Sequence, residues 1–496
     1  MESLIYQIND IIWSSAFIAV ALGVGIYFSI ILRFPQLRLV PLMAKLLFRG
    51  NETKQGVSSF QAFAMAISGR VGTGNIAGVA TAIALGGPGA VFWMWVSAFL
   101  GAATAFAEST LGQMYKRVDH DEYRGGPAYY IRHGLGLNWY ACIFALATIL
   151  AMTMFLPGIQ AKSVVQGITL AFGWQPWAVG LLIVIPLGLV IFGGVHRIAH
   201  VAQILVPLMA AAYILVSLVI IIMNIDAVPK VFNLILSSAF GTSQVFGGIV
   251  GLSISWGIKR GIYSNEAGQG SAAHAASAAE VRHPAEQGLV QAFSVYIDTL
   301  LVCSATAFMI LFTGSYNVVQ RDASGKDIGY VAEHLPGVEY GTQFTQYAVD
   351  SQFAGYGQGF VAVALFFFAF TTLMAYYYMA ETNIAFLNQK RNWRWPVPCL
   401  RIVILLSTFY GVFSAAGYVW TLGDIGVGIM AWLNIVALIL LRKPIIRTLK
   451  DYERQRKSGE PITFRPSDLD IPNASYWEDR QTTSHQADEP DPSPHT

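Results

Sequence analysis

Two short stretches place glycines, an asparagine and basic residues inside otherwise apolar segments of the chain. One runs from Ser68 to Gly78 and the other from Gly257 to Gly268. Laid on each other, they match at Arg70 with Arg260, Asn75 with Asn265, Ala77 with Ala267 and Gly78 with Gly268. A backbone group freed in hydrocarbon costs several kcal/mol unless protein or water satisfies it. Helices interrupted at corresponding places of two chain halves indicate a transporter's binding site.

The first stretch has the residue types of an anion site. The helix is expected to unwind at Gly72 and to begin again near Asn75. The backbone N–H groups of Thr73, Gly74 and Asn75 would then point into a cavity, where they and the helix dipole favour a carboxylate. Glycine also lets a ligand approach the backbone. The alternative is a close helix contact through Gly74 and Gly78, and the matching second stretch, with its expected break between residues 261 and 268, favours the anion site.

A hard cation would find oxygen ligands near the same break. Gly69 and Gly72 free carbonyl groups, and the pair Thr371–Thr372 places two hydroxyls deep in an apolar run. Such oxygens suit Na⁺ by the logic that gives oxygen ligands to other hard cations. Buried threonines also commonly bond back to the preceding helical turn, and the sequence weighs these two interpretations about equally.

Charged residues within apolar membrane segments are candidate functional residues. They are Arg70, Glu108, Lys259, Arg260, Glu266 and Asp298. Buried ion pairs that fix helix positions are one interpretation, and gating coupled to protonation is the other. His274 is expected to be a packing or capping residue. We find no nucleophile and base set, zinc spacing or phosphate loop, so no catalytic residue is assigned and an enzyme is not expected. A channel would need rings of acids or carbonyl loops, which are also missing.

The elements that position these residues are membrane helices. Hydrophobic residues make up 54% of the 496 and charged residues 12%, while the net charge of +2 gives no sign of a nucleic-acid partner. The first apolar run lacks a basic leader and is expected to be an uncleaved span. Apolar length and turn residues predict an all-α membrane protein with eleven spans. They cover about 11–33, 57–86, 89–116, 138–167, 176–194, 197–224, 245–280, 286–313, 357–387, 397–417 and 419–441.

Lysine and arginine accumulate in alternate loops, which predicts an N-terminus outside and a cytoplasmic C-terminus. The two interrupted spans then enter from opposite sides, as in an inverted repeat of five plus five helices behind one extra helix. The basic stretch 35–54 is expected to lie as a helix on the membrane surface. The expected units are an N-terminal helix and linker (1–56), a first repeat (57–224), an extracellular connection (225–244), a second repeat (245–441) and a disordered cytoplasmic tail (442–496).

Several motifs in order resemble one transporter family. They are Gly72–Ile83, Gly125–Ile131, Lys259–Gly268, Asp298–Cys303 and Phe368–Thr372. Together they resemble the alanine/glycine:cation symporters, also called sodium:alanine symporters, over about residues 10–450. The resemblance implies the inverted-repeat fold of the bacterial leucine transporter. It also implies symport of a small neutral amino acid, alanine or glycine, with Na⁺ or H⁺ across a bacterial or archaeal cell membrane.

The resemblance also implies which residues bind. The substrate carboxylate is expected at Gly72, Thr73, Gly74 and Asn75, faced by Ser264, Asn265 and Gly268 of the second stretch. A sodium site is expected between the carbonyls of Ser68 and Val71 and the hydroxyls of Thr371 and Thr372. The sequence departs from many family members at Gln269, where methionine is common, and at Tyr376, where tryptophan is common. Both changes would enlarge the pocket or make it more polar, so glutamine is an alternative substrate.

Overall fold

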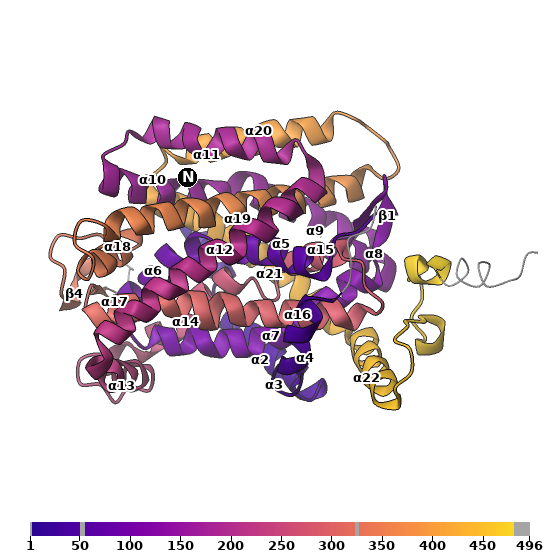
Figure 1. Cartoon of the computed structure of the whole chain (residues 1–496), viewed down its shortest axis with the longest axis horizontal. Coiled ribbons are helices and arrows are strands. Elements are labelled where there is room, and N and C mark those ends of the chain that lie inside the picture. The colour runs from indigo at the N-terminus through magenta and orange to yellow at the C-terminus, as the bar shows by residue number, and fades with distance from the viewer. Residues whose placement is uncertain (1, 50–54, 323–326, 481–496) are drawn as a thin grey trace, which may run out of the picture.

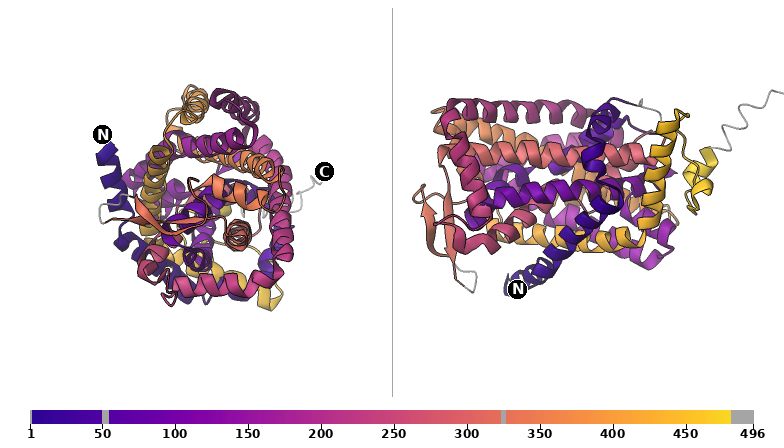
Figure 2. Two further views of the ribbon diagram at one scale, coloured as in Figure 1. Left: turned by 90° about the vertical axis from the view of Figure 1, so that its left-hand side faces the viewer. Right: turned by 90° about the horizontal axis from the view of Figure 1, so that it is seen from below.

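The computed structural model describes residues 2–49, 55–322 and 327–480, and these are mostly helical. Figure 1 shows a bundle whose long helices run along one axis, and the end-on view of Figure 2 shows them side by side. The first half of the chain forms α1 (Glu2–Ile12), α2 (Ser15–Ile31), α3 (Pro35–Arg38), α4 (Val40–Leu47), α5 (Ser59–Arg70), a π-helical turn (Gly74–Gly78), α6 (Val79–Gly86), α7 (Ala90–Met114), β1 (Arg117–Asp119), β2 (Glu122–Arg124), α8 (Pro127–Leu135), α9 (Asn138–Leu150), a second π turn (Ala151–Phe155), α10 (Pro157–Phe172), α11 (Pro176–Ile191) and α12 (Gly194–Met223).

The second half contains the other interrupted helix and the C-terminal elements. It forms 3-10 turns (Ile225–Ala227, Gly247–Ile249, Ser467–Leu469), α13 (Val228–Ala239), α14 (Val250–Asn265), α15 (Ser271–Ala278), α16 (Pro284–Val295), a third π turn (Tyr296–Cys303), α17 (Ser304–Thr313), β3 (Asn317–Arg321), β4 (Asp327–Glu333), α18 (Thr342–Asp350), α19 (Gly357–Asn388), α20 (Pro396–Gly411), α21 (Ala416–Leu440) and α22 (Arg442–Ser458).

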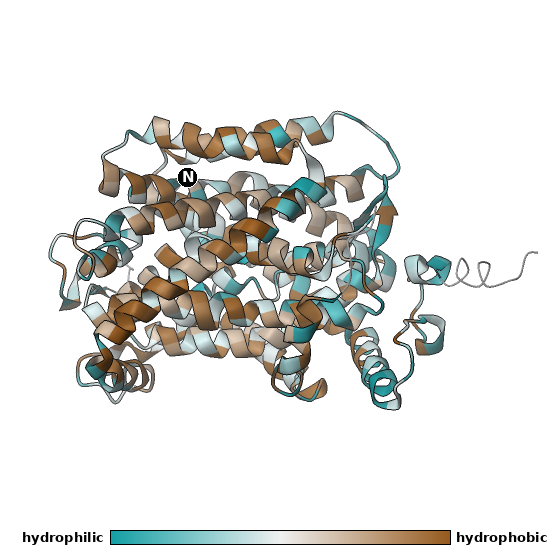
Figure 3. Ribbon diagram, viewed as in Figure 1, coloured by the Kyte–Doolittle hydropathy of each residue, from teal (hydrophilic) through white to brown (hydrophobic). Residues whose placement is uncertain are grey.

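The bundle has the dimensions and the surface of a membrane protein. Among the described residues, seven helical segments are long and apolar enough to cross a bilayer, and three shorter helices are similarly apolar. Figure 3 shows apolar residues along the length of the bundle and polar residues gathered at one end, around α22 and α8. A predominantly helical membrane protein is therefore confirmed.

Small residues bring the central helices into close contact. α7 packs along α14, α15 and α16. A Cβ on Gly257 would lie 2.6 Å from the Trp93 Cβ, and one on Gly288 would lie 2.9 Å from the Phe106 carbonyl oxygen. Because close approach of membrane helices gains dispersion energy without competing with water, glycines at these contacts stabilise the packing. This arrangement places α7 beside both arms of the second interrupted helix.

Two antiparallel hairpins lie at opposite ends of the bundle. β1 pairs with β2, with Arg117 opposite Arg124, and lies at the end that carries α8 and α22. β3 pairs with β4, with Asn317 opposite Glu333, and lies at the end that carries α13 and α18. The two ends of the bundle are thus built from different elements.

The disordered tail expected over 442–496 is wrong for residues 442–480. α22 follows α21 after one residue and crosses the end of the bundle (Figure 2), and Trp477 is 2% exposed. The Trp477 indole donates to the Gln113 carbonyl at 3.0 Å, and the Lys116 ammonium lies 4.0 Å from the Tyr123 ring centroid and 4.5 Å from that of Tyr476. The polar composition of residues 451–480 gave no indication of these few aromatic contacts. Residues 481–496 of the expected tail lie outside the described residues.

The basic stretch expected on the membrane surface is helical over α3 and α4, and its residues 50–54 lie outside the described residues.

Candidate functional site

The first interrupted helix breaks at Val71–Thr73. α5 starts from a capping box in which the Ser58 and Gln61 side chains bond to each other's backbone N–H groups. It ends at Arg70, and the chain resumes as a π-helical turn at Gly74. The break expected between Gly72 and Asn75 is therefore observed, and both its start and its end lie one residue closer to the N-terminus than expected.

Amide side chains satisfy the N–H groups that this break frees. The Gly72 N–H donates to Asn75 Oδ1 at 2.8 Å, and the Thr73 N–H donates to Gln160 Oε1 of α10 at 3.2 Å. Within the described structure the buried Thr73 hydroxyl has no partner. Two backbone donors thus bond to neutral side-chain oxygens that another acceptor, such as a carboxylate, would replace, and the Thr73 hydroxyl is a further donor for it.

The second interrupted helix breaks later than expected. α14 continues through Gly261 to Asn265, and the chain leaves helical geometry at Glu266, whose φ is +54°. The expected break from Gly261 was wrong, because Gly261 serves packing: a Cβ there would overlap the Ser97 hydroxyl of α7. Gly268 and Gly270, with φ of +86° and +83°, then adopt the left-handed conformation that favours glycine.

A buried carboxylate holds the second break. Glu108 Oε2 accepts from the N–H groups of Gly268 at 3.1 Å and Gly270 at 3.0 Å, and from Asn434 Nδ2 at 2.9 Å. Asn434 also donates to the Gly268 carbonyl at 3.0 Å, and the Tyr130 hydroxyl donates to Asn434 Oδ1. The unwound segment therefore carries satisfied backbone groups inside the bundle, as a break at membrane depth requires.

Asp298 joins the two interrupted helices. Its Oδ1 accepts from Asn75 Nδ2 at 2.6 Å, and the Ser264 hydroxyl donates to the same carboxylate at 3.1 and 3.0 Å. The Thr299 hydroxyl donates to Oδ2 at 2.6 Å, and Asp298 is fully buried in the third π turn. The carboxylate and the hydroxyl oxygens of Ser264 and Thr299 are ligands of the kind that a hard cation prefers, whereas the Asn75 amide nitrogen is not.

The structure brings together part of the expected sodium site. The Thr372 hydroxyl lies 3.4 Å from the Val71 carbonyl oxygen, and a Cβ on Gly72 would come within 2.5 Å of that hydroxyl. Thr371 instead bonds back to Phe367 and Phe368 and faces Met209. Ser68, whose carbonyl is the other expected ligand, is fully buried, and its hydroxyl bonds to the Met65 carbonyl of its own helix. One of the two threonines therefore faces the break.

The remaining expected residues divide between two places. Tyr376 lies with the first break, where its hydroxyl accepts from Gln160 Nε2 at 3.2 Å. Asn265 accepts from the Ala267 N–H at 3.0 Å and, with Gly268, contacts α7 and α21. Gln269 is fully buried and donates to the Ile262 carbonyl at 2.7 Å. From the second stretch, Ser264 reaches the first break through Asp298, and Tyr263 lies against it directly, since a Cβ on Gly74 would be 3.1 Å from the Tyr263 ring.

Three residues of the observed polar networks were missing from the site predicted from the sequence. Gln160, Asn434 and Asp424 each supply a polar group to a buried network, and Asp298 was singled out as a charge but not as a ligand. Gln160 and Asn434 each lie among mostly apolar residues of an expected span. A single amide or acid in a membrane span is the signal that would have identified all three residues as candidates.

The buried cations near the second break have a carboxylate partner. Asp424 of α21 accepts from Arg260 at 2.6 Å and from Lys259 at 2.7 Å. Arg70 donates to the Gln291 carbonyl at 3.1 Å and to the Ser294 hydroxyl. Lys259 and Arg260 therefore form ion pairs, with Asp424 and not with one of the three acids singled out from the sequence.

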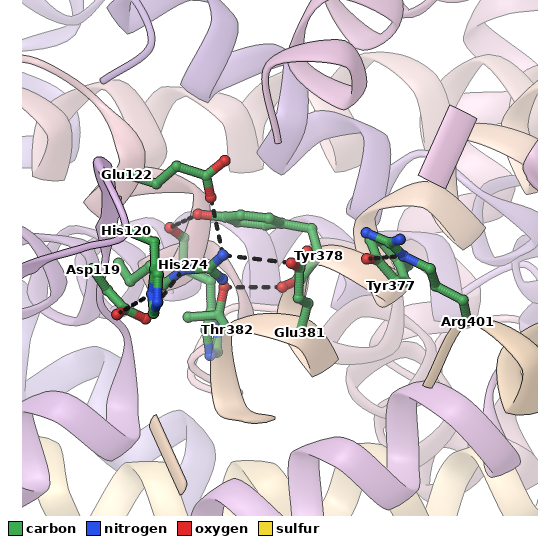
Figure 4. A network of polar contacts seen from close by, with 10 residues as sticks. Asp119, His120, Glu122, His274, Tyr377, Tyr378, Glu381, Thr382 and Arg401 are labelled. Carbon is green, nitrogen blue, oxygen red and sulfur yellow. Dashed lines mark hydrogen bonds and ion pairs between the residues drawn. The ribbon is translucent and has the colours of Figure 1, made fainter. Parts of the chain in front are cut away.

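An ion-pair network lies at the end of the bundle that carries the β1–β2 hairpin. The Arg124 guanidinium lies 2.9 Å from Glu122 and 3.4 Å from Glu381, two residues that Figure 4 shows close to each other. His274 of α15 is buried nearby, and its ring contacts Asn383 of α19 at 2.9 Å, so it is a packing residue as expected. The hairpin, α15 and α19 are therefore tied together at this end.

Comparison with known proteins places these features in one family. Residues 1–466 match the model of the sodium:alanine symporter family. A putative sodium/proton-dependent alanine carrier protein of Bacillus subtilis is 56% identical over 97% of this chain and 99% of its own length, and a sodium/proton-dependent alanine carrier protein of Bacillus sp. PS3 is 52% identical over 88% and 97%. A probable sodium/glutamine symporter of B. subtilis is 40% identical over 94% and 93%.

The fold also resembles solved transporters at low sequence identity. A Na⁺-coupled sialic acid symporter in a substrate-bound outward-open state superposes with a TM-score of 0.52 at 13% identity, covering 97% of this chain and 98% of the other. A manganese transporter of Eremococcus coleocola superposes with a TM-score of 0.50 at 14% identity, covering 88% and 97%. The chain therefore has the fold of a membrane transporter.

Proposed function

Because the chain belongs to the sodium:alanine symporter family, we propose that it takes up a small neutral amino acid, alanine first, together with Na⁺. The observation that carries the proposal is the meeting of two interrupted helices at Asp298, where Asn75 and Ser264 bond to one buried carboxylate. The relatives named as sodium/proton-dependent alanine carriers support the substrate and the ion. Glycine is the next candidate, since it presents the same carboxylate and amine with one methyl group less.

The substrate carboxylate binds at the first break. It accepts from the N–H groups of Gly72 and Thr73 in place of the Asn75 and Gln160 side-chain oxygens, so no backbone donor loses a partner on exchange. The Thr73 hydroxyl supplies a further donor. Fixed dipoles that already point at the anion cost little reorganisation when the substrate enters, which favours binding.

Two groups of oxygen atoms bind the coupling ions. At the first, Na⁺ bridges the Val71 carbonyl and the Thr372 hydroxyl and so joins the first break to α19. At the second, a cation or a proton at Asp298 joins the two interrupted helices. An ion that holds the first break in its binding conformation raises amino-acid affinity, and the amino acid raises ion affinity by the same factor.

We propose the expected arrangement of eleven spans as an inverted repeat, with the N-terminus outside. The interrupted segments α5–α6 and α14–α15 fall within the second and seventh of these spans. The end closed by Arg124 and Glu381 is then cytoplasmic, and it opens when the ion pair separates. Alternating access moves the interrupted helices relative to α19 while the site stays near mid-membrane.

Uptake of radiolabelled alanine into proteoliposomes tests the proposal. We expect accumulation driven by an inward Na⁺ gradient, and loss of at least about tenfold in Asn75→Ala, which removes the bond to Asp298 and the cap on Gly72. Asn317→Ala is a matched control, because Asn317 is equally buried but lies on β3 at the far end of the bundle. Normal uptake by Asn75→Ala would contradict the site.

Competing amino acids and gradients distinguish the alternatives. Glutamine is the alternative to alanine and glycine, because the Gln269 side-chain oxygen is buried without a partner in the described residues and a relative is named for glutamine. Sodium-driven glutamine uptake with little alanine uptake would establish it. Alanine uptake that follows a proton gradient and ignores Na⁺ would assign the coupling to Asp298 and exclude the Thr372 site.

A further inference from the structure

The basic segments at the ends of the first and last apolar helices meet at one place on the surface. α3 and α4 follow α2, and α22 follows α21. Arg38 of α3 bonds to Glu453 of α22 at 2.8 Å, and Figure 1 shows α4 and α22 close together at the same end of the bundle. Two segments that are far apart in the sequence therefore form one surface, which we call the α4–α22 surface.

The outer face of α22 carries basic side chains at helical spacing. The exposed positions include Lys443, Arg447, Lys450, Arg454 and Lys457, while Ile445, Leu449 and Tyr452 are buried on the opposite face. This spacing puts the five cations on one stripe of the helix. The helix is thus packed by its apolar side and presents positive charge outward.

Both acidic residues of α22 are already engaged. Asp451 is 7% exposed and bonds to Arg454 at 2.6 Å, with the His283 ring at 3.4 Å. Glu453 is engaged by Arg38. In the described part of the chain no salt bridge involves Lys450 or Lys457. The surface therefore keeps an excess of positive charge that its own acids do not neutralise.

Arg456 and Arg49 lie near the ends of α22 and α4. Arg456 is one turn after Tyr452 on the same row of α22, and Arg49 is two residues beyond the end of α4. The fields of Arg456, Arg49 and Arg282 also act on the Tyr452 phenol, where they oppose the rise in pKa to about 12 that burial causes. Arg282 is engaged by Glu286 at 2.8 Å. Arg49 and Arg456 have no salt bridge to any described residue, and both are exposed.

Large apolar side chains lie exposed beside these cations. Phe48, next to Arg49, is 79% exposed, and Leu37, next to Arg38, is 58% exposed. Exposed aromatic and aliphatic residues among arginines and lysines are typical of a helix that lies at the boundary of headgroups and acyl chains. α4 is then at the depth of the headgroups, because only the one-turn helix α3 separates it from the end of the apolar helix α2.

We propose that the α4–α22 surface binds the phosphodiester headgroup of an anionic phospholipid through Arg49 and Arg456, with Phe48 inserted among the acyl chains. The occupant is a lipid, because a soluble anion would use the cations but leave Phe48 and Leu37 in water. Clusters of lysine and arginine immediately beside a membrane helix attract anionic lipids. This inference goes beyond the transport proposal, since a failure here would leave the uptake experiment unchanged.

The test counts lipids bound to the purified full chain by native mass spectrometry, with phosphatidylglycerol and phosphatidylcholine titrated separately. We expect tighter binding of phosphatidylglycerol, weakened by salt. Arg49→Gln with Arg456→Gln should reduce this binding about fivefold for each charge removed. Lys230→Gln with Lys390→Gln is the matched control, since it removes the same charge from exposed positions elsewhere.

Several outcomes would overturn the proposal. They are equal binding of the two lipids by the wild-type chain, equal loss in the control, unchanged binding by the double variant, and displacement of the lipid by excess inorganic phosphate. An unchanged thermal unfolding midpoint of the double variant excludes misfolding. If that midpoint falls, Arg49→Lys with Arg456→Lys restores the charge, and recovery of phosphatidylglycerol binding supports the proposal while continued loss counts against it.

Discussion

At the scale of single residues, neighbouring side chains of the same type have different surroundings. Thr371 and Thr372 are both buried and both bond back to their own helix, yet only Thr372 reaches the Val71 carbonyl of the first break. The two hydroxyls point in different directions because successive side chains of an α-helix are about 100° apart around its axis. One hydroxyl thus faces the proposed ion and the other faces Met209.

This difference gives a prediction with a built-in control. Thr372→Val should raise the Na⁺ concentration for half-maximal uptake about tenfold, because it removes an oxygen ligand without changing the volume of the side chain. Thr371→Val should change it less than about twofold. Uptake measured against Na⁺ concentration checks both. Equal shifts in the two variants would show that the ion does not lie between Thr372 and Val71.

Asp298 gives a second prediction at this scale. Asp298→Asn keeps the shape of the side chain but removes the negative charge and adds a donor that would face the donors of Asn75 and Ser264. We expect loss of uptake by at least about tenfold. Glu333→Gln, an exposed position on β4, is the control for a lost carboxylate. Retained Na⁺-driven uptake in Asp298→Asn would remove Asp298 from the ion pathway.

At the scale of elements, the second interrupted helix keeps its shape through glycine geometry and a carboxylate on a neighbouring helix. Gly268 and Gly270 turn the chain through positive φ, and Glu108 of α7 accepts the N–H groups that the turn frees. Asn434 of α21 bonds to the same carboxylate. Two unbroken helices therefore hold the broken one, which gives it a defined geometry at a depth where water is scarce.

The prediction for this element compares two glycines with similar φ. At Gly270 an added Cβ would overlap the Cγ of Pro127, whereas at Gly136, with φ of +73°, nothing lies within 4 Å. Gly136→Ala should cost about 1 kcal/mol of backbone strain. Gly270→Ala should cost about 1–3 kcal/mol more through overpacking. Thermal unfolding of the two variants measures the difference, and equal midpoints would contradict the packing at Pro127.

At the scale of the whole molecule, the C-terminal segment is part of the folded end rather than an appendage. Trp477 and Tyr476 lie against Lys116 at the end of α7, and Arg480 bonds to Glu280 at 2.8 Å in the connection between α15 and α16. The same connection receives the Lys116 ammonium at the Ala279 carbonyl, at 2.8 Å. The segment therefore fastens the end of the second interrupted helix to α7.

Removing the buried indole should free this segment. Trp477→Ala should cost about 3–5 kcal/mol of local stability, and chymotrypsin should then cleave after Phe464, whose ring packs on Trp477, faster than in the wild-type chain. Trp393→Ala is the control, because Trp393 is 47% exposed and its ring contacts Trp395 and the Arg391 guanidinium at the surface. Equal cleavage rates in all three proteins would show that Trp477 does not hold the segment.

The sequence by itself determined the class of molecule and the place of its first break. Long apolar segments admit few structures in a bilayer, because every backbone group must bond internally, and the glycines around Thr73 are the natural point of interruption. Short motifs in order also predicted the family, and the match over residues 1–466 confirms it.

Only the tertiary structure decided which polar groups meet. The true start of the second break, the turning of Thr371 away from it, the roles of Gln160 and Asn434, and the packing of residues 459–480 all depend on contacts between segments that are far apart in the chain. Local composition carries no information about such partners. A glycine that serves packing, as Gly261 does, has the same letter as one that turns the backbone, and only the neighbour it meets in space tells them apart.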